Sequence, residues 1–417
     1  MGTLWTEVEL LEDDRNLTQD GHKARSVIAR FIAGRSRTSR SDIVKVTGLA
    51  RSTVDQHLRV LLDHGLIEES DASLSEVRGR PAQTFRISAD RGVVLVAAVS
   101  LSKTRLALTS LDKQIVRRAD IDVDVSIGPA RLLDEVSETF AAMMADAGLS
   151  PDKALAMSVG LPGPVDLRQG YAVRPPRMPG WDGYSVCKHM ADAFNCDIVV
   201  DNDVNLMALG EARALRGGSL PLLMVDIDSG IGGGLVSEDG LLLHGADGAA
   251  TTIGHTRVPD MQGVICHCGG KGCLEAVTSI DAIAARLGTV RGEPASPADL
   301  LQALTLGDGA ATSVVRDAAL LIGDVVANLV NFYNPARIVL GGPVTECTED
   351  MLAQIRSVVY QQAQPLATRN LSIVHSSLGN EAGLVGGMVN AIEQVLSPRG
   401  IQYQTRSADS KMLPLGL

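Results

Sequence analysis

The sequence has few cysteines, no long apolar run and no overall excess of positive charge. Six cysteines in 417 residues are too few to hold a chain of this size together by disulfides. No apolar run approaches the roughly 18 residues that a membrane-spanning helix requires. The first residues, MGTLWTEVELLEDD, are acidic, whereas an export signal is basic and then apolar. We therefore exclude a disulfide-stapled secreted protein and a membrane-bound one, and we expect a cytoplasmic protein.

The net charge of −11 would argue against a nucleic-acid partner if it were spread evenly, but it is not. Residues 21–66 contain nine Lys and Arg against three Asp, which gives a local balance of +6. A basic module therefore precedes an acidic body. Local charge of this kind supplies the non-specific attraction to phosphates that DNA binding needs.

Three short helices are predicted in the basic module. The first, KARSVIARFIAG, has its apolar residues on one face and ends at Gly34. The second, SRSDIVKVTG, begins with Ser39 as its cap and Asp42 as the capping-box acid, and it ends at Gly48. The third, ARSTVDQHLRVLLDHG, follows a tight turn and starts at Ala50, a poor cap. Its open face is polar, which suits a helix that reads the major groove.

Two short strands, LIEE and TFRIS, are predicted beyond Gly65, on either side of SEVRGRPAQ. An arginine at the tip of such a wing can enter a minor groove or contact phosphates. A solvated hairpin and a generic helical bundle are the alternatives. The basic charge, the turn glycine, the polar helix face and the wing together predict a winged helix-turn-helix over residues 21–90. The predicted DNA contacts are Arg40, Arg51, Ser52, Thr53, Asp55, Gln56, Arg59, Arg78 and Arg80.

After residue 90, the pattern becomes typical of α/β architecture. Apolar runs such as VVLVAAVS, ALAMSVGL, DIVVD, LLMVDI and RIVLGG alternate with helical stretches. The predicted helices cover residues 129–147, 203–215, 310–332, 348–362 and 381–395. Residues 1–20 and 397–417 lack periodicity, so mobile tails are predicted there.

Five strings in this region resemble, in order, the ROK family of bacterial repressors and sugar kinases. They are SVGLPGPVD, DNDVNLMALGE, SGIGGGLV, IGHTRV with CHCGGKGCLEA, and NPARIVLGG. Because a helix-turn-helix precedes them, the chain is similar to the family's xylose and N-acetylglucosamine repressors more than to its free-standing kinases. The resemblance implies that residues 91–396 form two actin-like lobes, of the sugar kinase and ribonuclease H-like type, around a cleft. It also implies three partners: operator DNA, a sugar effector, and further copies of the chain in a dimer or tetramer.

Three cysteines within eight residues, Cys266, Cys268 and Cys273, lie close enough to bind one ion, and His255 is a natural fourth ligand. Four protein ligands leave no open position, which predicts a structural zinc site. Unrelated reduced cysteines are one alternative. A nucleic-acid-binding zinc module is another, although CHCGGKGC has one Lys and no aromatic residue. The resemblance implies that His255 also contacts the sugar, together with Glu275, so that the metal and ligand sites are coupled.

Asn202 and Asp203 resemble the family's sugar-contacting pair, in which the Asp is the general base of the kinases. Taken alone, Asp203 is better explained as a helix N-cap or a solvated loop acid than as a ligand contact. Thr252 stands where the family has a glutamate, and Arg177 where it has an asparagine. We therefore hypothesise that the effector carries a negative group, as in a sugar phosphate or a sugar acid, which pairs with Arg177. The alternative is a solvated Arg177 without a ligand role.

Two departures from the family pattern concern phosphate binding. In SLSKTR, Ser100 replaces the Asp of the kinases' first phosphate loop, and Ser102 and Lys103 replace glycines. Asp228 stands in the second loop, where a glycine is usual and where its charge would repel phosphates. Phosphoryl transfer depends on positioning and neutralising phosphates, so a kinase fold without enzyme activity is predicted. The alternative, a working sugar kinase that also binds DNA, is favoured by Asp203.

Overall fold

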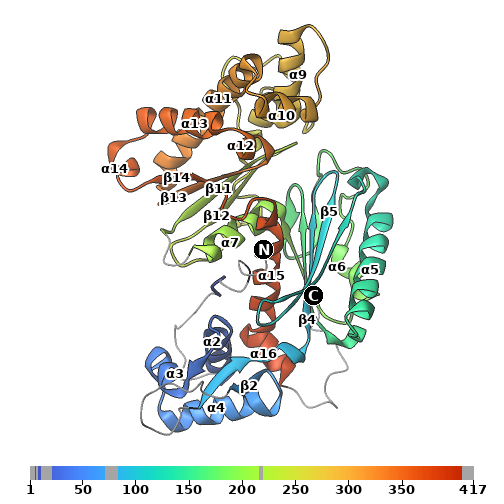
Figure 1. The fold of residues 1–417 in the computed structure, drawn as a ribbon, viewed down its shortest axis with the longest axis vertical. Helices are drawn as coiled ribbons and strands as arrows, with labels where there is room; N and C mark the ends of the chain where they lie inside the picture. The colour runs from blue at the N-terminus through green and yellow to red at the C-terminus, as the bar shows by residue number, and fades with distance from the viewer. Residues whose placement is uncertain (1–4, 6–7, 11–20, 71–82, 216–218, 406–417) are drawn as a thin grey trace.

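The computed structural model describes residues 5, 8–10, 21–70, 83–215 and 219–405. An amino-terminal domain lies at one end of the long axis, and two α/β lobes make up the rest (Figure 1). Lobe 1 comprises residues 93–202 and lobe 2 comprises residues 222–375. Among the described residues, no helix combines enough length with enough apolar character to span a bilayer.

The amino-terminal domain has the three helices and the two strands that the sequence predicts. Its elements are α2 (Gly21–Ala33), α3 (Arg40–Thr47), α4 (Arg51–Asp63), β1 (Thr38–Ser39), β2 (Ile67–Ser70) and β3 (Thr84–Ile87), with strand order β1-β3-β2. The capping box of Ser39 and Asp42 is present, and Gly48 ends α3 in the left-handed conformation. Ala50 makes no side-chain cap, as predicted. Residues 71–82, between β2 and β3, carry Arg78 and Arg80 and lie outside the described residues.

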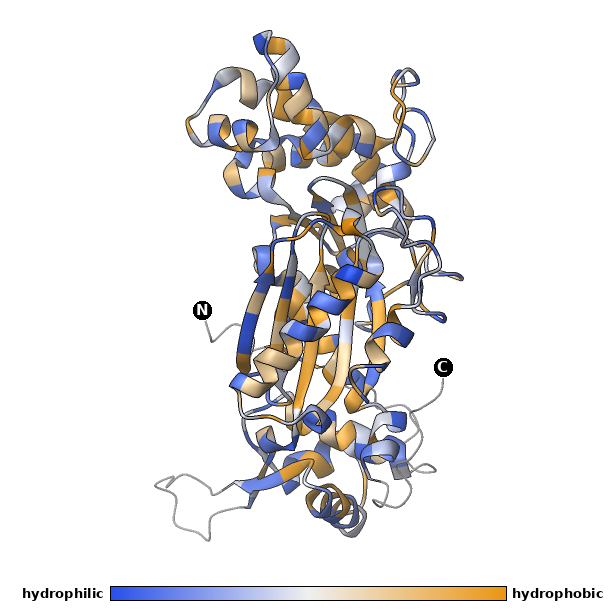
Figure 2. Cartoon of the chain, turned by 90° about the vertical axis from the view of Figure 1, so that its right-hand side faces the viewer, coloured by the Kyte–Doolittle hydropathy of each residue, from blue (hydrophilic) through white to orange (hydrophobic). Residues whose placement is uncertain are grey.

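Lobe 1 is a five-stranded mixed sheet that helices cover on its outer face. Its elements are β4 (Val93–Val99), β5 (Thr104–Ser110), β6 (Ile115–Ile121), α5 (Pro129–Asp146), β7 (Ala154–Leu161), β8 (Val165–Asp166), β9 (Tyr171–Ala172), α6 (Val186–Ala191) and β10 (Asp197–Asn202), and the order in the main sheet is β10-β7-β4-β5-β6. Figure 2 shows the apolar strands behind helices that are partly hydrophilic. Every residue of β7 is buried, which explains its continuous apolar run.

Lobe 2 is a four-stranded sheet with a helical layer. Its elements are β11 (Leu222–Ile227), β12 (Ile231–Val236), α8 (Leu274–Thr278), α9 (Ile280–Arg291), α10 (Pro297–Thr305), α11 (Gly309–Tyr333), β13 (Arg337–Gly341), α12 (Pro343–Cys347), α13 (Glu349–Gln362), α14 (Pro365–Thr368) and β14 (Ser372–His375), and the strand order is β12-β11-β13-β14. The α/β prediction is therefore confirmed in both lobes. The five helices predicted beyond residue 90 are all present, with ends within one residue of the expected positions.

Two helices, α7 (Asp203–Ala214) and α15 (Ala382–Val395), lie between the sheets of the two lobes and pack on each other. Glycines allow this contact. A Cβ atom at Gly386 would overlap the backbone oxygen of Leu206, and one at Gly210 would lie 2.5 Å from the backbone oxygen of Ala382. The backbones of α7 and α15 are therefore in direct contact, and we call these two helices the central helix pair.

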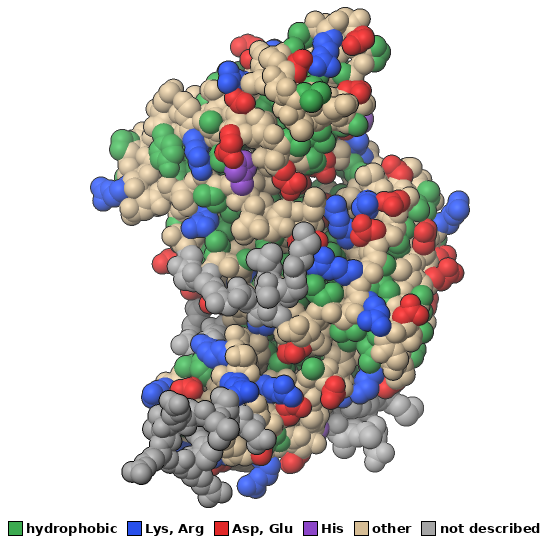
Figure 3. All heavy atoms as spheres, in the orientation of Figure 1, with side chains coloured by type: hydrophobic (Ala, Val, Ile, Leu, Met, Phe, Trp, Pro, Cys, Tyr) green, Lys and Arg blue, Asp and Glu red, His purple; other side chains and the backbone are tan. Residues whose placement is uncertain are grey.

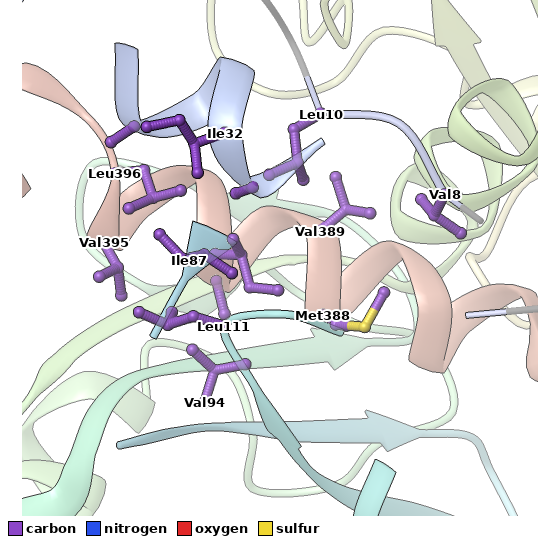
Figure 4. Packing of buried hydrophobic residues seen from close by; sticks show 14 of the residues in the cluster. Val8, Leu10, Ile32, Ile87, Val94, Leu111, Met388, Val389, Val395 and Leu396 are labelled. Carbon is purple, nitrogen blue, oxygen red and sulfur yellow. The ribbon is translucent and has the colours of Figure 1, made fainter. Parts of the chain in front are cut away.

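One continuous apolar cluster joins the amino-terminal domain to lobe 1 and the central helix pair. Figure 4 shows side chains from all three parts meeting, among them Ile32 of α2, Val94 of β4 and Met388 of α15. The amino-terminal domain is therefore packed against the rest of the chain, without an intervening gap in the core.

The predicted mobile tails need correction at both ends. Pro398–Gln404 form helix α16, in which the side chain of Ile401 is fully buried. Trp5, Val8 and Leu10 are buried as well. Segments this short contain too few residues to show a periodic pattern. The surface that covers them comes from distant parts of the chain.

Substituting Gly386 with alanine is expected to destabilise the fold. The added methyl group would collide with backbone that is itself held in α7, and overpacking of this kind costs about 1–3 kcal/mol. The midpoint of urea unfolding of Gly386→Ala should fall accordingly. Gly309→Ala is the matched control, because open space surrounds this other helical glycine. Equal midpoints for the two variants would contradict the close approach of the helices.

Candidate ligand pocket, metal cluster and DNA interface

A pocket lies between the two lobes, at the amino-terminal end of α7. It brings together side chains that the sequence separates by up to 175 residues, since Ser100 and Glu275 both line it. Eight residues that the sequence analysis links to sugar or phosphate recognition line this pocket, whereas Ser102 and Lys103 do not. The eight are Ser100, Arg177, Asn202, Asp203, Asp228, Thr252, His255 and Glu275.

Asn202 fixes the start of α7. Its Oδ1 accepts hydrogen bonds from the backbone amides of Val204 (3.0 Å) and Asn205 (3.1 Å), so Asn202 is the N-cap of the helix. Its Nδ2 donates to the backbone oxygen of Gly163 (2.9 Å), which ties the loop after β7 to the helix. Asp203 is the first residue within α7, so the interpretation of Asp203 as the N-cap is wrong.

Asp203 is part of an acidic group inside the pocket. Burial, together with the nearby charge of Asp228, raises the pKa of Asp203 to about 7. Burial and the neighbouring carboxylates of Asp228 and Asp203 hold the pKa of Asp226 well above its ordinary value. Near neutral pH, Asp203 therefore exists in both protonation states, and a carboxyl group of this kind can donate to or accept from a sugar hydroxyl.

Arg177 crosses from lobe 1 to lobe 2. Its Nη1 donates to the backbone oxygen of Ser229 (2.5 Å) and pairs with Oδ2 of Asp281 (3.2 Å). The guanidinium therefore has protein partners while it lines the pocket, and it is not merely a solvated loop residue. An anionic ligand group would have to compete with Asp281 for it.

The turn between β4 and β5 is closed on itself. The Oγ of Ser100 donates to the backbone oxygen of Lys103 (2.7 Å), and the backbone amide of Ser100 donates to the same oxygen (2.8 Å). Lys103 points toward β6, where it pairs with Asp122 (2.9 Å) and Asp120 (3.3 Å). Neither side chain offers this turn a charge that would bind a magnesium nucleotide.

The predicted metal ligands converge. One nitrogen of His255 and the Sγ atoms of the three cysteines all lie within 4.8 Å of one another. His255 Nδ1 is 3.7 Å from Cys266 Sγ, and Cys268 Sγ is 3.7 Å from Cys273 Sγ. In a tetrahedral site with Zn–S bonds of about 2.3 Å, two sulfurs stand about 3.8 Å apart. The cluster thus has the donors and the spacing of a tetrahedral metal site.

The metal cluster adjoins the pocket. Because Nδ1 of His255 faces Cys266, Nε2 is the nitrogen that remains for the pocket, which His255 also lines. Glu275 lies between them: its Oε2 accepts from the backbone amide of Ile231 (3.2 Å), and its Oε1 is 4.0 Å from Cys266 Sγ. A shift of the cluster would therefore move two pocket side chains.

Sequence reasoning missed a buried network behind the pocket. The carboxylate of Asp201 is 3% exposed and accepts from the backbone amide of Asn202 (2.7 Å) and from Asn205 Nδ2 (2.9 Å). It also contacts His244 Nε2 (2.8 Å), which holds the loop after β12. Asp201 lies near the end of β10 and Asn205 lies in the first turn of the helix that follows, so their contact depends on the strand-to-helix turn, and nothing in the sequence pointed to His244.

The predicted DNA contacts lie mostly on the open face of α4. Arg51, Ser52, Gln56 and Arg59 are exposed, and Thr53 is partly so. Figure 3 shows Lys and Arg side chains on this lower end of the molecule, with some acidic ones among them.

Arg40 and Asp55, both predicted to contact DNA, pair with each other. The distance between Arg40 Nε and Asp55 Oδ1 is 2.5 Å, and Arg40 also donates to Gln83 Oε1 (3.2 Å). This pair links α3 to α4 and gives Asp55, the one acid among the predicted DNA contacts, a cationic partner. Arg78 and Arg80 lie outside the described residues.

Comparisons with known proteins agree with this architecture. A helix-turn-helix domain model matches residues 21–70, and the ROK family model matches residues 99–394. The DNA-binding transcriptional repressor Mlc of Escherichia coli is 25% identical over 369 residues, which cover 86% of this chain and 90% of that protein. A glucokinase of Halalkalibacterium halodurans is 28% identical over 298 residues, covering 68% of this chain and 90% of that enzyme.

A solved structure extends the match to both parts of the chain. The crystal structure of a ROK family transcriptional regulator, a homolog of the E. coli Mlc protein, superposes with a TM-score of 0.77 at 26% identity. The superposition covers 92% of this chain and 98% of that one, so the kinase-like fold with a helix-turn-helix in front is confirmed. Because the family model spans well over half of its residues, this protein belongs to the ROK family.

Proposed function

We propose that this protein is a sugar-responsive transcription regulator, acting as a repressor. Its helix-turn-helix binds operator DNA, and a sugar in the pocket changes that binding. The observation that carries the proposal is the continuous apolar cluster, which makes one body of a basic helix-turn-helix and a two-lobed pocket. The similarity to the E. coli repressor over 86% of the chain supports it.

The proposed sugar contacts are Asn202, Asp203, His255, Glu275 and Arg177. Asp203 can both donate and accept, and His255 Nε2 adds a further polar group, so together they suit hydroxyl groups, which do both. An anionic effector would have to compete with Asp281, which already pairs with Arg177. With Asp226 and Asp228, the lining contains four carboxyl groups, since Asp203 and Glu275 carry the other two. A neutral sugar therefore suits this lining better than a sugar phosphate does.

We further propose that kinase activity is lost. The closed turn at Ser100 offers no charge for a magnesium nucleotide, and Asp228 adds negative charge where phosphates would lie. The second candidate is a working sugar kinase that also binds DNA. The retained Asp203 and the similarity to a glucokinase favour that candidate.

For the metal cluster, we propose a structural zinc ion held by His255, Cys266, Cys268 and Cys273. Four protein donors leave no position for a substrate, so the ion would brace the loop and supply no reaction step. Its place next to the pocket would let it fix the orientation of His255 and Glu275.

As a mechanism, we propose that the bound sugar changes the angle between the lobes. In a homodimer or tetramer of this cytoplasmic regulator, such a change would move two amino-terminal domains away from the spacing of their DNA half-sites. Linkage requires only that the sugar bind the two arrangements unequally.

Removing a positive charge from the open face of α4 should weaken DNA binding. Arg59→Ala is expected to lower affinity for DNA from the chain's own upstream region by about tenfold or more, with a shallower salt dependence if the lost contact is to phosphate. Fluorescence anisotropy measures both effects. Arg286→Ala is the control, because this exposed arginine lies on α9 in lobe 2. Equal losses in both variants would argue against α4 as the DNA-reading helix.

Calorimetry with paired ligands tests the pocket. D-Glucose and N-acetyl-D-glucosamine should each bind more tightly than their 6-phosphates, because the acidic lining repels the added charge. Asp203→Asn should lower the affinity for the neutral sugar, whereas Asp192→Asn, exposed in lobe 1, should not. Tighter binding of the phosphates would restore the anionic-effector hypothesis. Release of ADP from ATP with either sugar would favour the kinase candidate.

Loss of one metal ligand should affect both the cluster and the pocket. Cys268→Ser is expected to release bound zinc, as measured by atomic absorption, and to lower both the melting temperature and sugar affinity. Cys347→Ser, at an isolated cysteine, should leave all three unchanged. Full zinc content in Cys268→Ser would refute the proposed ligand set.

A further inference from the structure

Helix α7 begins at the pocket, and its last turn contacts α15 near the point where the amino-terminal domain is attached. Its first residues, Asn202 and Asp203, line the pocket. Its last turn carries Arg213, which is only 6% exposed. At this far end the guanidinium makes a two-pronged pair with Glu393 of α15, with Nε to Oε1 at 3.0 Å and Nη2 to Oε2 at 3.4 Å. Its Nη1 donates to the backbone oxygen of Gly240 (2.8 Å), in the turn after β12.

The segment that includes Glu393 is where the amino-terminal domain is attached. Arg30 of α2 donates through Nη2 to the backbone oxygen of Glu393 (3.0 Å). Ser26, also of α2, donates through Oγ to the backbone oxygen of Leu396 (2.5 Å). Figure 4 shows the side chains of Val395, Leu396 and Ile32 close together in the same region. Helix α2 is therefore attached at the carboxyl-terminal end of α15.

Residues 8–10, which we call the strap, contact the last turn of α7 and a turn of lobe 1. The backbone amide of Glu9 donates to the backbone oxygen of Arg213 (3.0 Å), and the buried Lys113 donates through Nζ to the backbone oxygen of Val8 (2.6 Å). Trp5 lies just before the strap, with its ring 4.7 Å from the guanidinium carbon of Arg118. Arg213 thus contacts the strap through its backbone, and through its side chain it contacts Glu393, where α2 is attached.

We propose that Arg213 is the positioning residue through which the pocket helix holds the DNA-binding domain. The inference rests on the proposed function. Because Gly210 and Gly386 bring the backbones of α7 and α15 into contact, a displacement at the pocket end of α7 carries α15 with it. Arg213 and Glu393 fix the far end of this unit to α2. Bidentate, buried pairs of this kind hold a defined geometry, and a neutral side chain cannot replace them.

Hydrogen exchange in the full-length protein tests the inference without any ligand. In Arg213→Gln, backbone amides of α2 should exchange about tenfold faster or more, because the substitution removes the two-pronged contact to Glu393, the residue to which Arg30 of α2 is bonded. Amides of the loop that holds Cys266 and Cys273 should keep their rates. Arg316→Gln, which removes an exposed arginine paired with Asp350, is the matched control and should change neither. Unchanged exchange in α2 of Arg213→Gln would overturn the proposal.

Two further variants keep the test decisive. If Arg213→Gln fails to fold, Lys113→Met removes the other tie to the strap and should speed exchange in α2 in the same way. A charge swap separates positioning from general damage: Arg213→Glu should lose protection in α2, and Arg213→Glu combined with Glu393→Arg should regain it. No recovery in the double variant would mean that the pair itself does not position α2.

DNA binding separates this inference from the proposed function. If D-glucose or N-acetyl-D-glucosamine alters DNA affinity in the natural chain, the change should disappear in Arg213→Gln while sugar affinity stays within about twofold. An undiminished change would overturn the role of Arg213 alone. If neither sugar alters DNA affinity in the natural chain, the proposed function fails, and the exchange experiment still decides whether Arg213 holds α2.

Discussion

Gly210 of α7 and Gly386 of α15 bring two helix backbones into direct contact between the sheets of the two lobes. No side chain separates the helices at these points, so they cannot slide or repack without a collision. The pocket sits at one end of this pair, and the amino-terminal domain sits at the other. The arrangement of the whole molecule depends on this contact, because it gives two distant sites a common rigid support.

The pocket lies at one end of the central helix pair, and its lining is acidic. The carboxyl groups of Asp203, Asp226 and Asp228 are close to one another and shielded from water, which raises the pKa of each. With a pKa of about 7, Asp203 can bind a hydroxyl in either direction, and any carboxylate of the lining that is ionised would repel a phosphate. Under the proposed function, the same carboxyl groups that would bind a sugar would also disfavour the nucleotide that a kinase needs. The closed turn at Ser100 acts in the same direction.

The metal cluster and the strap stiffen opposite ends of this arrangement. Near the pocket, the Cys and His donors converge in a loop that has little regular structure of its own, and the proposed metal ion would fix this loop and the ring of His255. Near the amino-terminal domain, Trp5 and residues 8–10 cover apolar surface that α15 and β5 would otherwise expose.

Local features could be predicted from the sequence because they depend on neighbours within a few residues. The capping box of Ser39, the face of α4 and the clustering of Cys266, Cys268 and Cys273 are of this kind, and the structure confirms each of them as geometry. The alternation of apolar runs and helical stretches gave the α/β class for the same reason, since burial repeats with the period of each element.

Only the tertiary structure shows which residues from distant parts of the chain contact one another. The pairing of Arg177 with Asp281, the contact of His244 with Asp201 and the burial of Ile401 all join residues whose sequence positions carry no mark of one another. Which side chain meets which across the lobes depends on strand order and helix packing. A linear pattern reports the period of one element at a time and does not contain that information.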